Sequence, residues 1–308
     1  MYLEHFGFKE YPFKLTPNTN FYVSLKSHSE ASRVLETALD MGEGFIKVTG
    51  EVGTGKTLLC RRLLNSLNES FIAAYVPDPC LTPAELRRAL ACELDLPNYD
   101  TIDAELLMAA LQKHLVELAA EGKFVVLIVD EAQALPFESL EALRLLTNLE
   151  TEQKKLVQVV LFGQTELDER LKSEELRQLR QRITFSYKLQ PLNKEELVRY
   201  INHRLITAGY NEADGLFNER LFSMLAEASR GIPRLINVLC HKALMLGYGQ
   251  GVKSLSQEHI IAAVDDTEDT HLTVAEDKST QPIVMLAAMF GGGIAVGAIV
   301  VWSMGGLG

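Results

Sequence analysis

The stretch from Gly50 to Thr57 reads Gly-Glu-Val-Gly-Thr-Gly-Lys-Thr and fits the pattern G-x-x-x-x-G-K-[ST]. Glycines at this spacing let the backbone turn sharply and bring its N–H groups close to phosphate oxygens. Lys56 would reach the β- and γ-phosphates of a nucleotide, and the Thr57 hydroxyl would offer an oxygen to Mg²⁺. We therefore expect a phosphate-binding loop formed by Gly50, Glu51, Val52, Gly53, Thr54, Gly55, Lys56, Thr57 and Leu58.

Two carboxylates, Asp130 and Glu131, follow six consecutive apolar residues at 124–129. An open α/β sheet binds its ligand beyond the carboxyl ends of the strands, so these carboxylates should meet the phosphate loop. Asp130 would hold Mg²⁺, directly or through water, and Glu131 would orient and deprotonate the attacking water. The alternative, that two acids simply end a strand at the surface, is weakened by the glycine loop upstream.

Gln164 comes just after 157–162, which is expected to be a further buried strand, and is a candidate for contact with the γ-phosphate or the attacking water. A plain turn at this position is the alternative.

Arg234 comes directly after a proline that is expected to start a helix. A helix start does not favour a cation, and an anionic ligand nearby would offset that cost. Arg234 is therefore predicted to contact the nucleotide.

Arg180 lies at the end of a charged segment, 166–181, that is expected to form one long helix, and Arg182 follows that segment directly. An arginine cluster of this kind is usually a solvated helix face. Here the alternative is an arginine finger that reaches the nucleotide of a neighbouring subunit, because guanidinium stabilises the charge that develops during phosphoryl transfer.

The elements that must position these residues follow from the spacing of apolar residues, which predicts alternating strands and helices up to Pro191 and helices alone beyond it. Alternation of this kind is typical of a parallel sheet with helices on both faces. Strands are expected at 45–49, 71–76, 124–129, 157–162 and 183–190, and the later helices start near Asn193, Asn218, Ile232 and Ser256.

The predicted domains are a nucleotide-binding α/β domain at 1–190 and a helical lid at 191–265. An irregular segment, 1–28, opens the first of these. Its aromatic side chains either belong to a core or shelter an adenine ring. The residues concerned are Phe6, Phe8, Phe13, Phe21 and Tyr22.

An acidic linker at 266–281 leads to a segment, 282–303, that is expected to be a transmembrane helix. Residues 283–302 carry no charge, and a helix of about 20 apolar residues is long enough to cross a bilayer. A buried soluble helix and a disordered tail are the alternatives, because glycines at 291–293 and 297 reduce the hydrophobicity. The need for ATP places the nucleotide-binding domain in the cytoplasm.

Composition limits the classes of partner. The 308-residue chain has a formal net charge of −11, which does not favour non-specific binding to the nucleic-acid backbone. Its four cysteines are scattered without a C-x-x-C pair, which argues against a zinc site and for a reducing compartment.

The order of these motifs resembles that of an AAA+ ATPase, a P-loop NTPase fold. More narrowly, the chain is similar to the ExeA/GspA-like ATPases, and within them to the group that serves MSHA pilus biogenesis (MshM). The likeness is carried by residues 1–22 and by GEVGTGKT (50–57), VDEAQAL (129–135), LRLLTNLET (143–151), LFGQTELDERL (161–171) and LRQLRQRI (176–183).

This resemblance implies an ATPase linked to the bacterial inner membrane by a single transmembrane helix. It would hydrolyse ATP with Mg²⁺, act as a homo-oligomer, and help proteins of a type IV pilus or of the general secretion apparatus to assemble. The alternative is a DNA-binding regulatory ATPase of the transposition (TniB-like) type. The acidic charge and the apolar C-terminal segment speak against it.

Overall fold

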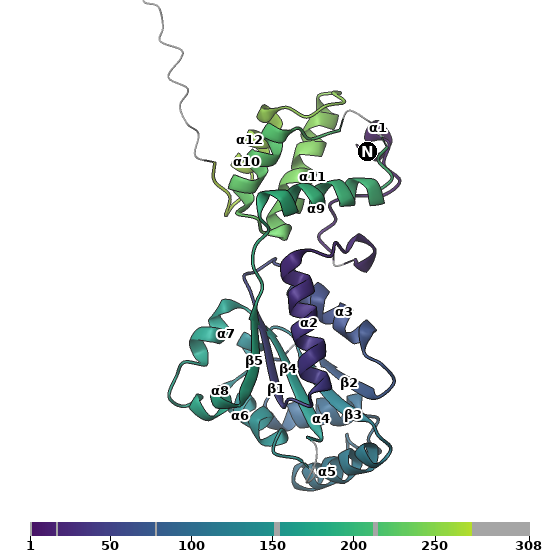
Figure 1. Ribbon diagram of the computed structural model, residues 1–308, viewed down its shortest axis with the longest axis vertical. Helices are drawn as coiled ribbons and strands as arrows, with labels where there is room; N and C mark the ends of the chain where they lie inside the picture. Colours follow the sequence, from purple (N-terminus) through teal and green to yellow (C-terminus); the bar gives the residue numbers. More distant parts are fainter. Residues whose placement is uncertain (1, 17, 78, 151–154, 212–214, 273–308) are drawn as a thin grey trace, which may run out of the picture. The chain divides into compact units, whose positions relative to one another are not determined.

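Short runs rich in valine, isoleucine and phenylalanine form the strands of a parallel sheet. The computed structural model describes residues 2–16, 18–77, 79–150, 155–211 and 215–272 (Figure 1). Within this part of the chain, five strands pair in the order β2-β3-β4-β1-β5. They are β1 (Phe45–Thr49), β2 (Phe71–Val76), β3 (Phe124–Val129), β4 (Val157–Gly163) and β5 (Ile183–Lys188).

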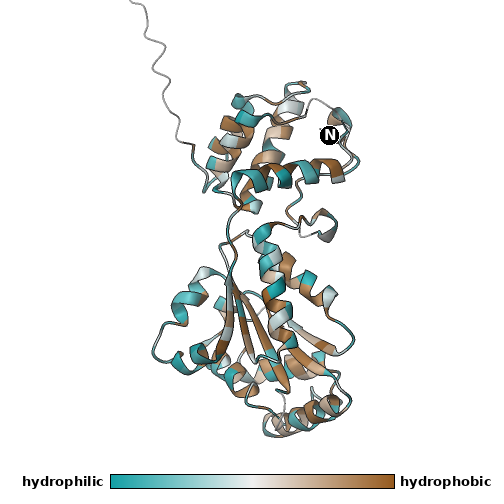
Figure 2. Cartoon of the chain, in the orientation of Figure 1, coloured by the Kyte–Doolittle hydropathy of each residue, from teal (hydrophilic) through white to brown (hydrophobic). Residues whose placement is uncertain are grey.

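Helices cover both faces of this sheet, as predicted. One face packs against α2 (Lys26–Asp40) and α3 (Lys56–Ser66). The other packs against α4 (Pro83–Glu93), α5 (Ala104–Ala120), α6 (Phe137–Leu146), α7 (Thr165–Arg170) and α8 (Arg177–Arg182). Figure 2 shows strong hydrophobic colour on the inner strands of the sheet, which lie between these two layers of helices, whereas the edge strand β5 is largely hydrophilic. β1, β3 and β4 are therefore the interior of the domain, whereas the edge strand β5 has no fully buried residue.

Beyond the sheet the chain is helical, with starts where the sequence predicts them. The helices are α9 (Lys194–Thr207), α10 (Glu219–Ser229), α11 (Pro233–Gly249) and α12 (Gln257–Asp265). Asn193 and Asn218 accept hydrogen bonds from backbone N–H groups in the first turns of α9 and α10, and Pro233 opens α11. These four helices form the helical domain.

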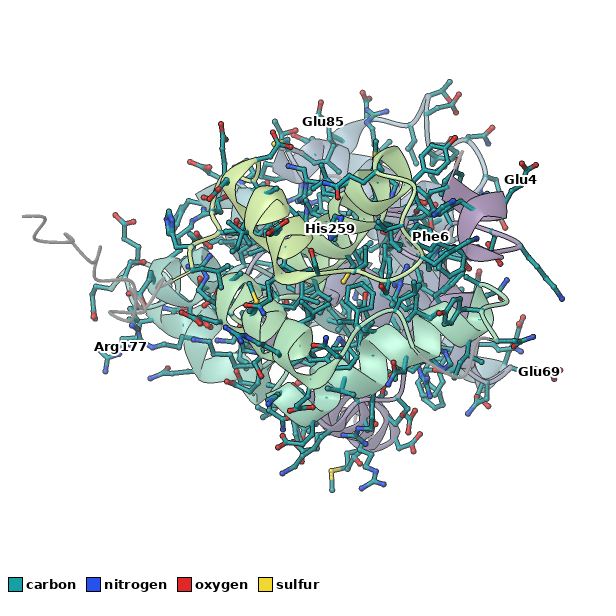
Figure 3. The ribbon with its side chains drawn as sticks, turned by 90° about the horizontal axis from the view of Figure 1, so that it is seen from above. Glu4, Phe6, Glu69, Glu85, Arg177 and His259 are labelled. Carbon is teal, nitrogen blue, oxygen red and sulfur yellow. The ribbon has the colours of Figure 1, made fainter. Side chains whose placement is uncertain are left out.

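The N-terminal segment differs from its predicted place in the nucleotide-binding domain. It forms α1 (Tyr2–Phe6) and a short 3₁₀ helix, η1 (Thr19–Phe21), and its buried aromatic side chains join the core of the helical domain. In Figure 3, Phe6 lies among the helices of that domain whereas Glu4 points outward. A small helical domain buries little core by itself, and the aromatic residues extend it. Phe6, Phe8, Phe13 and Phe21 are therefore core residues rather than a shelter for adenine.

The prediction of a single helix at 166–181 was wrong. Two short helices, α7 and α8, flank a break in which Leu171 and Leu176 are both buried in the same core. Five residues along a continuous helix correspond to a rotation of about 140°, which would turn one of these leucines away from that core. The break lets both side chains reach it.

The predicted transmembrane helix, 282–303, lies outside the described residues, as does most of the acidic linker. Among the helices that the structure describes, each is too short or too polar to cross a membrane.

Candidate functional site

The carboxyl ends of three neighbouring strands bring the predicted site together. Thr49 at the end of β1 pairs with Gly163 at the end of β4, and Val129 at the end of β3 pairs with Leu161. The next residues in each chain segment are Gly50, Asp130 and Gln164. The convergence that the sequence predicts is confirmed.

The phosphate loop depends on glycines in the left-handed backbone region. Gly53 has φ +83° and Gly55 has φ +98°. A Cβ atom on Gly53 would lie 2.5 Å from the Cβ atom of Arg234, a separation that real structures do not tolerate. Thr54 completes the loop by donating a hydrogen bond from Oγ1 to the carbonyl of Glu51 at 2.8 Å. Conformation and space therefore both require glycine at position 53.

Lys56 is the first residue of α3 and is almost completely buried. Its Nζ donates hydrogen bonds to the carbonyls of Gly50 and Glu51, each at 3.0 Å. Burial lowers the pKa of Lys56, while the negative charges of Glu131 and Asp130 oppose that shift. The ammonium group is thus held by two carbonyls of the loop and interacts electrostatically with the carboxylates of Glu131 and Asp130.

Asp130 is buried, and burial raises its pKa, while hydrogen bonds from Thr57 and from the backbone N–H of Glu131 act in the opposite direction. A carboxylate and a hydroxyl side by side are hard oxygen ligands of the kind that Mg²⁺ prefers. A buried carboxylate is also stabilised by a cation. Thr57 and Asp130 therefore fit a magnesium ion.

Glu131 is held in an unusual position. Its backbone is left-handed, with φ +49°, which is uncommon for a residue other than glycine. Two side-chain amides donate to the same carboxylate oxygen, Oε2: Gln133 Nε2 at 2.6 Å and Gln164 Nε2 at 3.0 Å. Burial opposes ionisation, but these two bonds and the charge of Lys56 outweigh it and lower the pKa of Glu131. An ionised carboxylate is thereby fixed at the end of β3.

Gln133 was missed by the sequence reasoning. Its Oε1 accepts a hydrogen bond from the backbone N–H of Gln164 at 2.9 Å, so one amide joins the ends of β3 and β4. Its position two residues after Glu131 is the signal that was available. Gln164 contacts both the Glu131 carboxylate and the Gln133 side chain, which supports a role beyond a simple turn.

A cavity of about 390 Å³ is lined by many of the residues described above, although Asp130 and Gln133 are not in its lining. Its lining includes nine predicted ones: Val52, Gly53, Gly55, Lys56, Thr57, Leu58, Glu131, Gln164 and Arg234. It also includes residues that the sequence did not single out, from the N-terminal segment (Lys14, Leu15, Thr16 and Asn18) and from the helical domain (Tyr200, Arg204, Pro233 and Asn237).

Three of these additional residues form a buried polar network. The Tyr200 hydroxyl donates to Oδ1 of Asn237 at 3.0 Å, and Arg204 donates to the Tyr200 hydroxyl at 2.9 Å and to the carbonyl of Pro12 at 2.6 Å. The network thus ties the N-terminal segment to the helical domain at the edge of the cavity.

Arg180 and Arg182 lie on α8, outside the set of residues that line the cavity in the described structure. Arg180 is exposed and donates a hydrogen bond from Nη1 to the carbonyl of Leu171 at 3.0 Å. Neither arginine lines the cavity of its own chain, so a role in phosphoryl transfer for either one would require the cavity of a second subunit.

Comparison with known proteins agrees with this geometry. The protein family described as "AAA domain" matches residues 39–171, which run from the end of α2 through the phosphate loop, β3 and β4 to the end of α7. Residues 39–171 are therefore similar to an AAA domain. The chain is also 43% identical over 251 residues to General secretion pathway protein A of Aeromonas hydrophila. That match covers 82% of this chain and 46% of the relative, so the chain spans about half of the relative's length.

Solved structures show the same fold. The ORC2 protein of Aeropyrum pernix matches with a TM-score of 0.60 and 17% identity, over 86% of this chain and 75% of that one. CDC6P of Pyrobaculum aerophilum matches with a TM-score of 0.61 and 18% identity, over 82% and 71%. At these identities the likeness extends to the fold alone. Together with the family match, it supports a P-loop AAA+ α/β fold with a parallel sheet.

Proposed function

We propose that this AAA domain binds and hydrolyses ATP with Mg²⁺. The observation that carries the proposal is the meeting of Lys56, Thr57, Glu131, Gln164 and Arg234 in one cavity. An AAA domain with a complete phosphate loop and paired acids at the end of β3 has the groups that phosphoryl transfer requires.

Each residue has a distinct task in this proposal. Lys56 and the loop amides bind and orient the phosphates. Thr57 and Asp130 hold Mg²⁺, which when bound neutralises phosphate charge. Gln133 and Gln164 hold one oxygen of the Glu131 carboxylate, so that Oε1 is the oxygen available to orient and deprotonate water. Arg234 senses the terminal phosphate from α11.

An assay that measures ATP hydrolysis by the amount of phosphate released tests the catalytic proposal. The intact chain should hydrolyse ATP in a Mg²⁺-dependent reaction, and Lys56→Ala should lose nucleotide binding. Lys113→Ala is a matched control, because Lys113 lies on α5 and pairs there with Glu117. Absence of ATP binding by the intact protein, or unchanged binding by Lys56→Ala, would overturn the proposal.

We further propose that the ATPase acts as a homo-oligomer at the bacterial inner membrane, anchored by residues 282–303 with its AAA domain in the cytoplasm. Its partners would be assembly proteins of the general secretion apparatus or of an MSHA-like type IV pilus. The support is the 43% identity to a general secretion pathway protein and the apolar character of 283–302. The same identity favours this assignment over a transposition-type DNA-binding ATPase.

Membrane fractionation tests this second part. The full chain should sediment with membranes and resist carbonate extraction, whereas a chain ending at Lys278 should remain in the supernatant. If both chains remain in the supernatant and their ATPase activity responds to DNA, the membrane proposal is wrong.

A further inference from the structure

His28 lies in the first turn of α2 and is buried, and it has no part in the mechanism above. Its Nε2 lies 3.0 Å from the carbonyl oxygen of Thr54 in the phosphate loop. A carbonyl accepts hydrogen bonds, so Nε2 is the protonated nitrogen and Nδ1 is the bare one in the neutral ring. Burial lowers the pKa of His28, which favours this neutral form.

Packing does not account for a histidine at this position. Nδ1 is buried, and within the described residues it meets no hydrogen-bond partner. An unsatisfied buried acceptor destabilises the folded state. An apolar side chain of similar size would avoid this cost, so the contact between Nε2 and Thr54 is what the histidine adds.

This contact fixes the orientation of one peptide group in the phosphate loop. In a planar trans peptide, the carbonyl of Thr54 and the N–H of Gly55 point in opposite directions. His28 binds the carbonyl from the side of α2, so the N–H of Gly55 points away from α2, and Gly55 lines the nucleotide cavity. A flipped peptide would present a carbonyl oxygen to phosphate in place of an N–H donor.

The turn that carries His28 is itself held firmly. The backbone N–H of Lys26 donates to Oε1 of Glu196 on α9 at 3.1 Å. The backbone N–H of Gln190, in the connection that follows β5, donates to the hydroxyl of Ser27 at 2.9 Å. Contacts from the helical domain and from this connection therefore fix the side chain that supports the loop.

We propose that His28 is a positioning residue for phosphate binding, which holds the peptide between Thr54 and Gly55 so that its N–H faces the phosphates. The inference rests on the proposed nucleotide binding and adds a residue from outside the loop and the strand ends. Its effect should appear in nucleotide affinity rather than in the rate of the chemical step.

Titration of fluorescent ADP into the full-length protein and its variants tests this role. His28→Leu removes the donor and should raise the Kd about five- to tenfold, the effect of losing about 1 kcal/mol from a hydrogen bond. His28→Gln should stay within about twofold of the wild type, because the glutamine amide can place a donor near the position of Nε2. For the substrate ATP, KM should rise in His28→Leu while kcat at saturation changes less.

His114 provides a matched control, because its Nε2 lies 3.1 Å from the carbonyl of Leu94, far in sequence from the phosphate loop. His114→Leu should alter the thermal midpoint without changing the Kd for ADP. If His28→Leu does not fold, His28→Asn replaces it, since the shorter amide cannot reach Thr54.

The outcomes separate this inference from the proposed function. Weakened ADP binding in His28→Leu or His28→Asn, with rescue in His28→Gln, would support the positioning role. Equal affinity in wild type and His28→Leu, or an equal loss in His28→Gln and His28→Leu, would overturn it and leave the ATPase proposal standing. A wild-type protein that binds no ADP or ATP would overturn both.

Discussion

The backbone N–H of Arg234, the second residue of α11, donates a hydrogen bond to the carbonyl of Gly53 across 3.2 Å. This contact gives a partner to one of the backbone donors that a helix start leaves unpaired. It also joins the phosphate loop directly to the helical domain, next to the arginine proposed to sense the terminal phosphate.

Gly53→Ala should therefore damage both the loop and its contact with α11. The added Cβ atom would meet a left-handed backbone, which costs about 1–2 kcal/mol, and would also overlap Arg234. We expect a lower thermal midpoint and at least a tenfold loss of ADP affinity, by the scale that relates free energy to Kd. Gly122→Ala is the control: Gly122 has φ +77° but open space around its Cβ position, so the variant should lose stability and keep its affinity.

Glu131→Gln should bind ATP and hydrolyse it about 10²- to 10⁴-fold more slowly, the usual contribution of a general base. Phosphate release under saturating ATP measures the rate, and fluorescent nucleotide measures binding. Glu138→Gln, an exposed change on α6, should behave as wild type. Normal turnover by Glu131→Gln would exclude Glu131 as the base.

Gln133→Leu removes one of the two amides that stabilise the ionised Glu131 carboxylate. Loss of a donor to the charged form raises the pKa, so Glu131 would become protonated at a higher pH than in the wild type. The acidic limb of the kcat profile, where activity falls as pH decreases, should move upward in pH. Gln257→Leu in α12 should leave this limb in place.

The arginine finger can be tested by mixing two inactive variants. If Arg180 or Arg182 completes a neighbour's site, Lys56→Ala subunits should restore activity to Arg180→Ala or Arg182→Ala subunits. A mixture of Lys56→Ala and Glu131→Gln should stay inactive, because neither subunit then has a complete set of its own site residues. Arg177 on the same helix is exposed and forms an ion pair with Glu174 (Figure 3). The Arg177→Ala variant should therefore be active by itself, without being mixed with a second variant. An inactive Arg177→Ala variant would point to damage to α8 rather than to a finger.

The strands and the phosphate loop could be predicted because their signals are local. The run at 124–129 is continuously apolar and ends in two acids, and the structure places β3 over the same residues. Tyr200 and Asn237 could not be found in this way, because they lie on different helices and meet through tertiary packing. The break between α7 and α8 was missed because the charged residues around it are all acceptable in a helix, and only burial of Leu171 and Leu176 requires it.

The hydroxyl of Tyr2 lies 2.9 Å from Nδ1 of His241, a residue 239 positions further along the chain. In topological terms, the nucleotide-binding domain is an insertion within the helical domain. The N-terminal segment belongs to the core of the helical domain, the sheet and its helices follow, and α9–α12 then complete the helical core. Contacts of such long range form late. During synthesis, the aromatic side chains of the N-terminal segment therefore lack their partners in the helical domain until the whole nucleotide-binding domain has been made. We expect the nascent chain to expose these apolar side chains during that time, as surface of the kind that chaperones bind.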